Sequence, residues 1–402
     1  MSDEEVISSP PRSGAAVNAP RYQKVLEGTL GDPFSGGNRV SVLRNGIEIF
    51  PPMLEAIRQA RFSVDFLTFV YWKGEIARQF ADALTERASA GVRVRVILDA
   101  IGAVKMSTTL IERMRAAGVD VVWFRPPARW KLWELDNRTH RKVLVCDGRI
   151  AFTGGVGIAE EWEGDARNPD EWRDTHFQVE GPAVHGLQAA FLDNWVEAGQ
   201  SVQDDVAQLA HAEALKPVGK SQVQVVKTTA AANWSPIATL FHVLLILARH
   251  KVRITTAYFV PNAAMVQLLK ETVQRGVDVQ ILVPGPHHNH RMAQLAQEDE
   301  YAPLIQAGVR MWAYQPSMLH AKAVTVDDTV ACVGSANFDQ RSMSKDDELA
   351  LVILDEVVLS ELDRHFDEDR SHAMEMRAED YRQRGLFRRA KATVAGLFRN
   401  QT

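Results

Sequence analysis

The chain has 402 residues, which is long for a single hydrophobic core, so two domains or two fused halves are expected. Its hydrophobic fraction of 46% and charged fraction of 24% are typical of a globular protein. A formal net charge of -5 gives no general attraction to polyanions, so nucleic acid is not an expected partner.

The first thirty residues differ in composition from the chain that follows. Residues 1–30 are rich in Ser, Pro, Gly, Ala and charged residues, which predicts a flexible leader and ordered structure from about Asn38. Beyond it, apolar runs alternate with segments of helical periodicity, which favours an α/β fold in layers. Strands are expected over residues 64–71, 92–98 and 119–124, and helices over 74–90 and 111–117.

The second half of the chain repeats this pattern. Residues 252–259, 276–282 and 307–310 resemble residues 64–71, 91–97 and 117–120, at offsets far longer than a solenoid repeat. We therefore expect duplication of a whole domain, with a first lobe over 31–205 and a second over 206–370. Residues 201–222 are expected to connect the lobes, and residues 371–402 to form a charged helical tail.

Several features bear on the compartment. Cys146 and Cys332 lie in apolar, strand-like runs without metal-type spacing and predict buried thiols in a reducing compartment. The N-terminus lacks the basic start and apolar stretch of a signal peptide. The longest apolar run, residues 237–248, is shorter than the roughly 20 residues that span a bilayer. A cytoplasmic protein is expected, and peripheral membrane contact stays open.

The chemistry is carried by one motif that occurs in each half. The first copy is His140-Arg-Lys142-Val-Leu-Val-Cys-Asp147, and the second is His320-Ala-Lys322-Ala-Val-Thr-Val-Asp327. Each copy stands at the start of an expected strand, where alternation places His and Lys on the same face. The motif aspartates fall on the opposite face, so we expect Asp147 and Asp327 to hold a turn or a neighbouring backbone.

This set of side chains suits transfer at a phosphodiester. One neutral imidazole can attack phosphorus, while a second, protonated imidazole donates to the leaving oxygen. The two lysines can hold the nonbridging oxygens, so neither a metal nor another cofactor is expected. A single His-x-Lys pair would more often be a surface pair, but two copies at identical spacing are hard to explain by packing.

The paired motifs identify the chain as a member of the phospholipase D superfamily, and it most resembles the bacterial cardiolipin synthases. The resemblance runs from about Asn38 to Asp355 and includes residues 172–176, 258–261, 314–320 and 334–342. It implies two pseudo-symmetric αβα sandwich lobes with the active site at their interface. It also implies functional residues: His140 as nucleophile, His320 as general acid, and Lys142, Lys322, Asn337 and Ser335 as phosphate ligands. Spacing alone leaves open which histidine attacks.

The two halves are chemically unequal. Where the second has Gly334-Ser335-Ala-Asn337, the first has Gly154-Gly155-Val-Gly157. Each half also offers a carboxylate downstream of its motif that could orient an imidazole, Asp174 in the first and Glu348 in the second. In the superfamily that the chain resembles, these carboxylates cross between halves, so Asp174 is expected near His320 and Glu348 near His140. The alternative for either carboxylate is a surface ion pair.

Three segments invite further hypotheses. From residue 381 onward the tail is basic and amphipathic, which fits an anionic membrane surface, although docking on its own domain is the alternative. The segment Arg129–Trp133 could place aromatics at a lipid interface or lie buried under a loop. The run His287–His290 could line a substrate cleft or, less simply, bind a metal.

We therefore expect a phosphatidyltransferase that makes cardiolipin from a phosphatidylglycerol-like phospholipid through a phosphohistidine. It would act in the cytoplasm, peripherally on the inner face of the membrane. A phospholipase D that hydrolyses phospholipids is the first alternative, because only the second acceptor differs. A nuclease of the same superfamily is a further alternative, against which the acidic net charge counts. A catalytically dead scaffold is disfavoured by the intact motifs.

Overall fold

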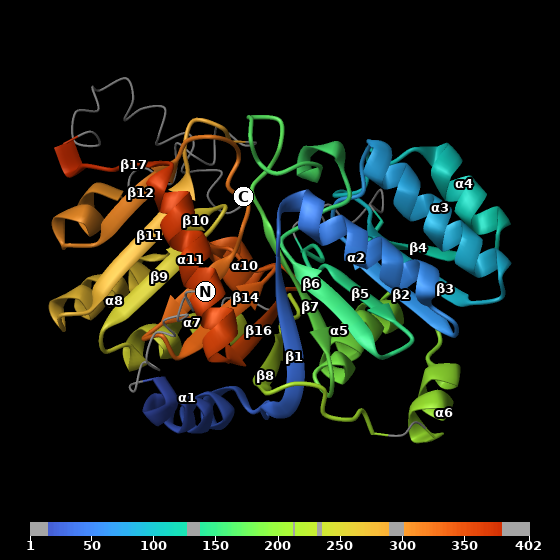
Figure 1. The fold of residues 1–402 in the computed structure, drawn as a ribbon, viewed down its shortest axis with the longest axis horizontal. Coiled ribbons are helices and arrows are strands. Elements are labelled where there is room, and N and C mark those ends of the chain that lie inside the picture. The colour runs from blue at the N-terminus through green and yellow to red at the C-terminus, as the bar shows by residue number, and fades with distance from the viewer. Residues whose placement is uncertain (1–14, 127–136, 212–213, 231–234, 289–300, 380–402) are drawn as a thin grey trace, which may run out of the picture.

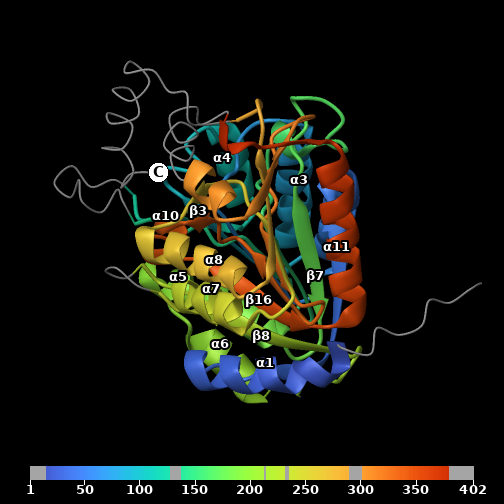
Figure 2. The ribbon, with the colours of Figure 1, turned by 90° about the vertical axis from the view of Figure 1, so that its left-hand side faces the viewer.

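Two α/β lobes lie side by side in the computed structural model, which describes residues 15–126, 137–211, 214–230, 235–288 and 301–379 (Figure 1). Their sheets join edge to edge into one sheet of 15 strands. Helices cover both faces; in the second lobe, α7 and α8 lie on the side opposite α11 (Figure 2). The predicted fold of two repeated αβα lobes is confirmed.

The first lobe contributes seven strands. In their order across the sheet, these are β4 (Asp120–Phe124), β3 (Arg93–Asp99), β2 (Ser63–Thr68), β5 (Val143–Cys146), β6 (Ile150–Gly154), β7 (Thr175–Glu180) and β1 (Ser35–Arg44). The first three are parallel and the others pair antiparallel. The side chains of β2 are buried throughout, as expected for a strand covered on both faces.

The second lobe repeats this strand order. Inward from the outermost strand β17 (Ala373–Glu375), which has no counterpart in the first lobe, it runs β12 (Arg310–Tyr314), β11 (Asp278–Pro284), β9 (Lys251–Thr255), β13 (Ala323–Val326), β14 (Val330–Gly334), β16 (Leu349–Leu354) and β8 (Ser221–Lys227). Antiparallel pairing of β1 with β8 joins the two lobes. A separate parallel pair is formed by β10 (Phe259–Val260) and β15 (Phe338–Asp339).

Helices fill the layers on either side of the sheet. They are α1 (Ala15–Leu30), α2 (Asn45–Gln59), α3 (Glu75–Ser89), α4 (Thr108–Ala116), the 3-10 turn η2 (Glu160–Trp162), α5 (Val184–Glu197), α6 (Gln203–His211), α7 (Pro236–Leu247), α8 (Ala263–Gln274), α10 (Gln340–Ser344) and α11 (Glu356–Ser371). Apolar residues of α5 and α11 share one core with strands of both lobes. Within the described part of the chain, no helix combines the length and apolar character needed to cross a bilayer.

The prediction of a flexible leader over residues 1–30 is wrong for residues 15–30. These form α1, which places the fully buried Tyr22 and Leu26 in the core of the second lobe. The Tyr22 hydroxyl donates to Oδ2 of Asp327 at 2.8 Å. The Ser- and Pro-rich composition belongs to residues 1–14, whereas Tyr22, Val25 and Leu26 have the spacing of one helical face. Order therefore begins before the expected Asn38.

Two predicted boundaries also differ from the structure. The boundary at 205/206 falls inside α6, where Asp205 accepts hydrogen bonds from the Arg95 guanidinium at 2.7 and 2.9 Å and so ties this helix to the first lobe. The tail was predicted from residue 371, but this residue is the last of α11, and the chain continues into β17 (Ala373–Glu375), which pairs with β12 and extends the second-lobe sheet. Residues 381–402, predicted to be a basic amphipathic helix, lie outside the described residues.

Candidate active site

The two His-x-Lys pairs meet where the lobes join. Lys142 immediately precedes β5, and Lys322 immediately precedes β13, which occupies the equivalent place in the second lobe. Both lysines and both histidines are largely buried. Repetition of one motif in two like-folded lobes thus produces a single site with two imidazoles and two ammonium groups.

Short backbone pairings carry the carboxylates from one lobe to the other. The His140 N–H donates to the Asp347 carbonyl at 2.9 Å, so Glu348 follows directly beside the first histidine. In the same way, the His320 N–H donates to the Arg173 carbonyl at 2.7 Å, beside Asp174. The crossed arrangement is therefore built into the main chain and does not depend on side-chain rotamers alone.

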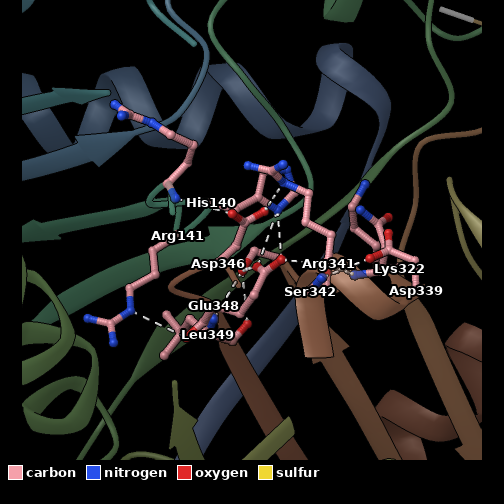
Figure 3. Close-up of polar contacts among 12 residues, drawn as sticks. His140, Arg141, Lys322, Asp339, Arg341, Ser342, Asp346, Glu348 and Leu349 are labelled. Atoms are coloured by element: carbon pink, nitrogen blue, oxygen red, sulfur yellow. Dashed lines mark hydrogen bonds and ion pairs between the residues drawn. The ribbon is translucent and has the colours of Figure 1, made fainter. Parts of the chain in front are cut away.

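His140 is held by Glu348. Its Nδ1 lies 3.0 Å from Oε1 and 3.2 Å from Oε2 of this carboxylate (Figure 3). The ring of Phe69 packs edge-on against the imidazole, with 5.2 Å between the centroids. A carboxylate on Nδ1 fixes the tautomer and leaves Nε2 as the nitrogen with a free electron pair.

His320 is held by Asp174 from the first lobe. Its Nδ1 lies 2.7 Å from Oδ2 of Asp174, and the indole N–H of Trp162 donates to the same oxygen at 2.8 Å. The rings of Trp162 and Trp172 flank the imidazole, with centroids 5.2 and 5.4 Å away. Nζ of Lys322 lies 3.0 Å from Nδ1 of His320, which brings the second-lobe cation against the ring.

The two carboxylates of the site have lowered pKa values although both are buried. Burial raises the pKa of Glu348, but the opposing charge and hydrogen bond of His140, together with Lys142, outweigh it and bring the pKa to about 2. Burial likewise raises the pKa of Asp174, yet His320 and Lys322 hold it below its usual value. Both carboxylates are therefore ionised at neutral pH.

The pKa values of the two lysines and the two histidines are lowered as well, but here burial is the cause. Burial is the main cause that lowers the pKa of Lys142 to about 7, with the nearby charge of Lys322 adding to it, and burial lowers that of Lys322 to about 8. Burial also lowers the pKa of His140, with Lys142 second, and that of His320 to about 3, with Lys322 second. A bound phosphodiester anion would offset these shifts, because it places negative charge among the four groups.

The motif aspartates hold backbone, at a distance from the histidines. Asp147 accepts from the N–H groups of residues 61, 62 and 63 at 2.7 to 3.1 Å. Asp327 accepts from those of residues 249, 250 and 251 at 2.8 to 3.0 Å. Each therefore anchors the chain entering a neighbouring central strand, β2 or β9, and lies at the far end of its own strand from the His-x-Lys pair.

Ser335 lies beside the carboxylate that holds His140. Its hydroxyl is fully buried and donates to Oε2 of Glu348, and its predicted contact with phosphate stays a prediction. Asn337 is 4% exposed, and its Oδ1 makes no hydrogen bond within the described residues. Its predicted contact with phosphate remains a prediction.

Ser342 is a site residue to which the sequence reasoning assigned no role. Its hydroxyl donates to Oε1 of Glu348 at 2.7 Å (Figure 3). Asp339 caps α10 by accepting from the Ser342 N–H at 2.8 Å, which fixes the position of this serine. Ser342 lies within the segment 334–342 that carried the family resemblance, and this position could have indicated that it belongs to the site.

In the first lobe, a tryptophan and not a serine donates to the carboxylate that holds the histidine. A Cβ built at Gly155, the counterpart of Ser335, would lie 2.1 Å from Oδ1 of Asp174. The position therefore requires glycine, and the indole of Trp162 supplies the donor that a serine supplies in the second lobe. Trp162 was missed because nothing in Glu160-Glu161-Trp162 marks it by spacing.

The structure describes only part of the two other segments that the sequence singled out, residues 287–290 and 129–133. The His288 ring packs edge-on against Tyr258, with 5.6 Å between the centroids, whereas Asn289 and His290 lie outside the described residues. The segment Arg129–Trp133 lies outside them as well. Among the side chains that the structure describes, no group of three or more His, Cys, Asp or Glu is arranged to hold a metal ion.

Comparison with known proteins gives one family. The family model described as "Cardiolipin synthase, PLD-like domain" matches residues 53–161 and 243–370. Cardiolipin synthase 1 of Bacillus cereus is 30% identical over 91% of this chain and 73% of its own length. Cardiolipin synthase A of Pseudomonas fluorescens is 32% identical over 91% of this chain and 75% of its own.

A solved structure shares the fold. Phosphatidylserine synthase of Haemophilus influenzae superposes with a TM-score of 0.70, at 16% identity, over 94% of this chain and 96% of its own. At this identity the likeness concerns the two-lobed architecture alone.

Proposed function

This chain belongs to the cardiolipin synthase family of phospholipase D-like proteins, and we propose from that premise how its site makes cardiolipin. The enzyme is a phosphatidyltransferase. The observation that carries the proposal is the pair of buried histidines, each held through Nδ1 by a carboxylate of the opposite lobe. Such an arrangement provides one imidazole for attack and one for proton transfer, and neither imidazole is required to bind a metal.

In the first step, Nε2 of His140 attacks the phosphorus of a phosphatidylglycerol-like lipid. The bond from phosphorus to the headgroup oxygen breaks, and His320 gives its proton to the departing alcohol. The phosphatidyl group is then held as a phosphoramidate on His140, whose positive ring is stabilised by Glu348 at 3.0 Å. Lys142, Lys322 and Asn337 hold the nonbridging oxygens.

In the second step, the hydroxyl of another phospholipid attacks the same phosphorus. His320, now neutral, takes the proton from that hydroxyl, and the bond between phosphorus and Nε2 breaks. Cardiolipin leaves and both histidines return to their starting protonation states. If water attacks instead, the product is phosphatidic acid, so exclusion of water decides between transferase and phospholipase D activity.

We also propose that the enzyme works at the inner face of the cell membrane as a peripheral protein. The basic residues of the tail from 381 onward support this, since each contributes roughly 1 kcal/mol near an anionic surface. A chain that lacks residues 381–402 should bind phosphatidylglycerol vesicles more weakly while its turnover of a soluble diester stays unchanged. Unchanged vesicle binding would exclude the tail as the anchor.

The reaction is tested by its products. Labelled phosphatidylglycerol incubated with the full chain should yield labelled cardiolipin and free glycerol, and added glycerol should drive the reaction backwards. A chelator should leave the rate unchanged, because the lysines supply the cationic charge. Formation of phosphatidic acid alone would make the protein a phospholipase D. Cleavage of DNA without activity on lipid would exclude both lipid reactions.

A further inference from the structure

We propose that the loop over residues 101–106 docks the enzyme on a bilayer containing anionic phospholipid, with Ile101 and Val104 entering its interfacial region. The inference rests on the proposed function, because a phosphatidyltransferase takes both of its substrates from a membrane. It concerns other residues than the C-terminal tail.

The loop leaves the sheet at the end that holds the histidines. It follows β3, whose residue Leu98 lies opposite Thr68 of the parallel strand β2. In turn, Leu67 of β2 lies opposite Val143, the residue directly after Lys142. The C-terminal end of β3 and the candidate active site therefore lie at the same end of the strands.

The loop exposes apolar side chains beside a cation. Ile101 is 40% exposed and Val104 is 71% exposed. Nζ of the exposed Lys105 lies 4.0 Å from the centroid of the half-buried Trp72 ring. One exposed aliphatic residue is ordinary on a protein surface, but two on one turn with a lysine and a tryptophan match the composition of contacts with the lipid interface.

The loop is also held rigidly and connects to His140. Oδ1 of Asp99 accepts from the N–H groups of Ile101 and Gly102, both at 2.9 Å, and the Trp72 indole donates to the Gly102 carbonyl at 2.6 Å. A Cβ at Gly102 would lie 2.2 Å from the carbonyl oxygen of Phe69, so this close approach requires glycine. The Phe69 ring in turn packs against His140.

This connection gives docking a consequence for catalysis. Phe69 contacts both Gly102 of the loop and the ring of His140, the candidate nucleophile. A bilayer in contact with Val104 therefore brings phospholipid headgroups to the histidines. The positive charge of Lys105 complements the anionic phosphates of those headgroups. A rigid loop keeps this distance constant, so that the substrate is presented at a fixed depth.

A rival surface lies at the opposite end of the first-lobe sheet. There Arg58, Arg61 and Arg149 surround Phe62, whose side chain is 67% exposed. The Phe62 N–H donates to Asp147, at the far end of β5 from Lys142. Docking through this basic surface would turn the histidines away from the bilayer, and it therefore serves as the alternative in the test.

A fluorescent probe at residue 104 tests the proposal. Cys146 and Cys332 are both buried, so an NBD label on Val104→Cys reports on that position. Vesicles of phosphatidylcholine and phosphatidylglycerol should shift its emission to the blue, and spin-labelled lipid should quench it. The same label on Val357→Cys is the matched control, because Val357 is 75% exposed and follows β16 at its end remote from Glu348.

The label on Phe62→Cys measures the rival surface. Neither this probe nor that at residue 357 should respond to vesicles. A silent probe at residue 104, an equal response at all three positions, or a response at residue 62 alone would overturn the proposal.

A charge at the tip of the loop gives an independent measurement. Val104→Asp should weaken binding to the same vesicles about tenfold, the scale expected when burial of one valine side chain is lost. Its turnover of a short-chain, water-soluble phospholipid should stay within about twofold of the parent, since the substitution is on the surface. Equal binding by this variant and the parent would contradict the proposal.

Failure of the docking loop and failure of the proposed function give different results. Cardiolipin formed by an enzyme whose probe at residue 104 stays silent would overturn the docking loop alone. A probe that enters the bilayer in a protein that forms no cardiolipin would support the docking loop and overturn the proposed reaction.

Discussion

Replacing Glu348 by glutamine should lower kcat about 100-fold while leaving the fold intact. The carboxylate is fully buried, which raises its pKa, but the charge and hydrogen bond of His140, the charge of Lys142 and the hydrogen bond of Ser335 bring the pKa from 4.5 to about 2. That difference corresponds to roughly 3 kcal/mol in favour of the ionised form. The glutamine amide is uncharged and cannot stabilise the positive ring that forms on His140 during attack, and a loss of about 2.7 kcal/mol at that stage gives a hundredfold lower rate.

The variant also disturbs the tautomer. A glutamine amide can donate to Nδ1 of His140, which would place the ring proton on Nε2 and remove the attacking electron pair. We expect kcat to fall with little change in KM, measured with phosphatidylglycerol in mixed micelles. Glu356→Gln is the matched control, because this residue is exposed at the start of α11. Activity of Glu348→Gln within threefold of the parent, with an unchanged near-UV CD spectrum, would refute this role for the carboxylate.

Three further predictions concern other parts of the structure. Gly155→Ala should reduce kcat at least tenfold, because its Cβ would lie 2.1 Å from Oδ1 of Asp174; full activity would mean that this carboxylate can move freely. The pKa values of the two motif lysines, about 7 and about 8, predict that kcat/KM falls as pH rises through this range, since each lysine is cationic below its pKa and neutral above it. A kcat/KM that is flat to pH 9 would contradict those cationic roles. Tyr22→Phe should lower the free energy of unfolding by about 1 kcal/mol through loss of the hydrogen bond to Asp327, measured by urea denaturation, with activity retained; unchanged stability would mean that α1 does not depend on this contact.

Periodicity predicted the strands and helices well because most of them are long and strongly patterned. The apolar runs at 92–98 and 276–282 became β3 and β11, and the repeat between halves became the mirrored strand order. The helix over residues 15–30 was missed because Tyr22 and Leu26, which are buried, stand among mostly polar residues in the sequence.

The site was predictable only to the level of its motifs. Identical spacing in two halves pointed to His140 and His320, and the family resemblance supplied the crossing of the carboxylates. Sequence spacing could not show that the Ser335 hydroxyl donates to Glu348, because that contact depends on how β14 and β16 align in space. The same holds for Trp162, which reaches Asp174 across twelve residues of chain.

The most direct test of the two-histidine reaction is to trap its covalent intermediate. The substrate should be a labelled phosphatidyl-p-nitrophenol, whose leaving group needs no proton. After rapid quenching, the parent and His320→Ala should carry label on a peptide containing His140, in a bond that is stable to alkali and labile to acid. His140→Ala should carry none. Label on His320 would reverse the two roles, and absence of label from the parent under single-turnover conditions would contradict a phosphohistidine altogether.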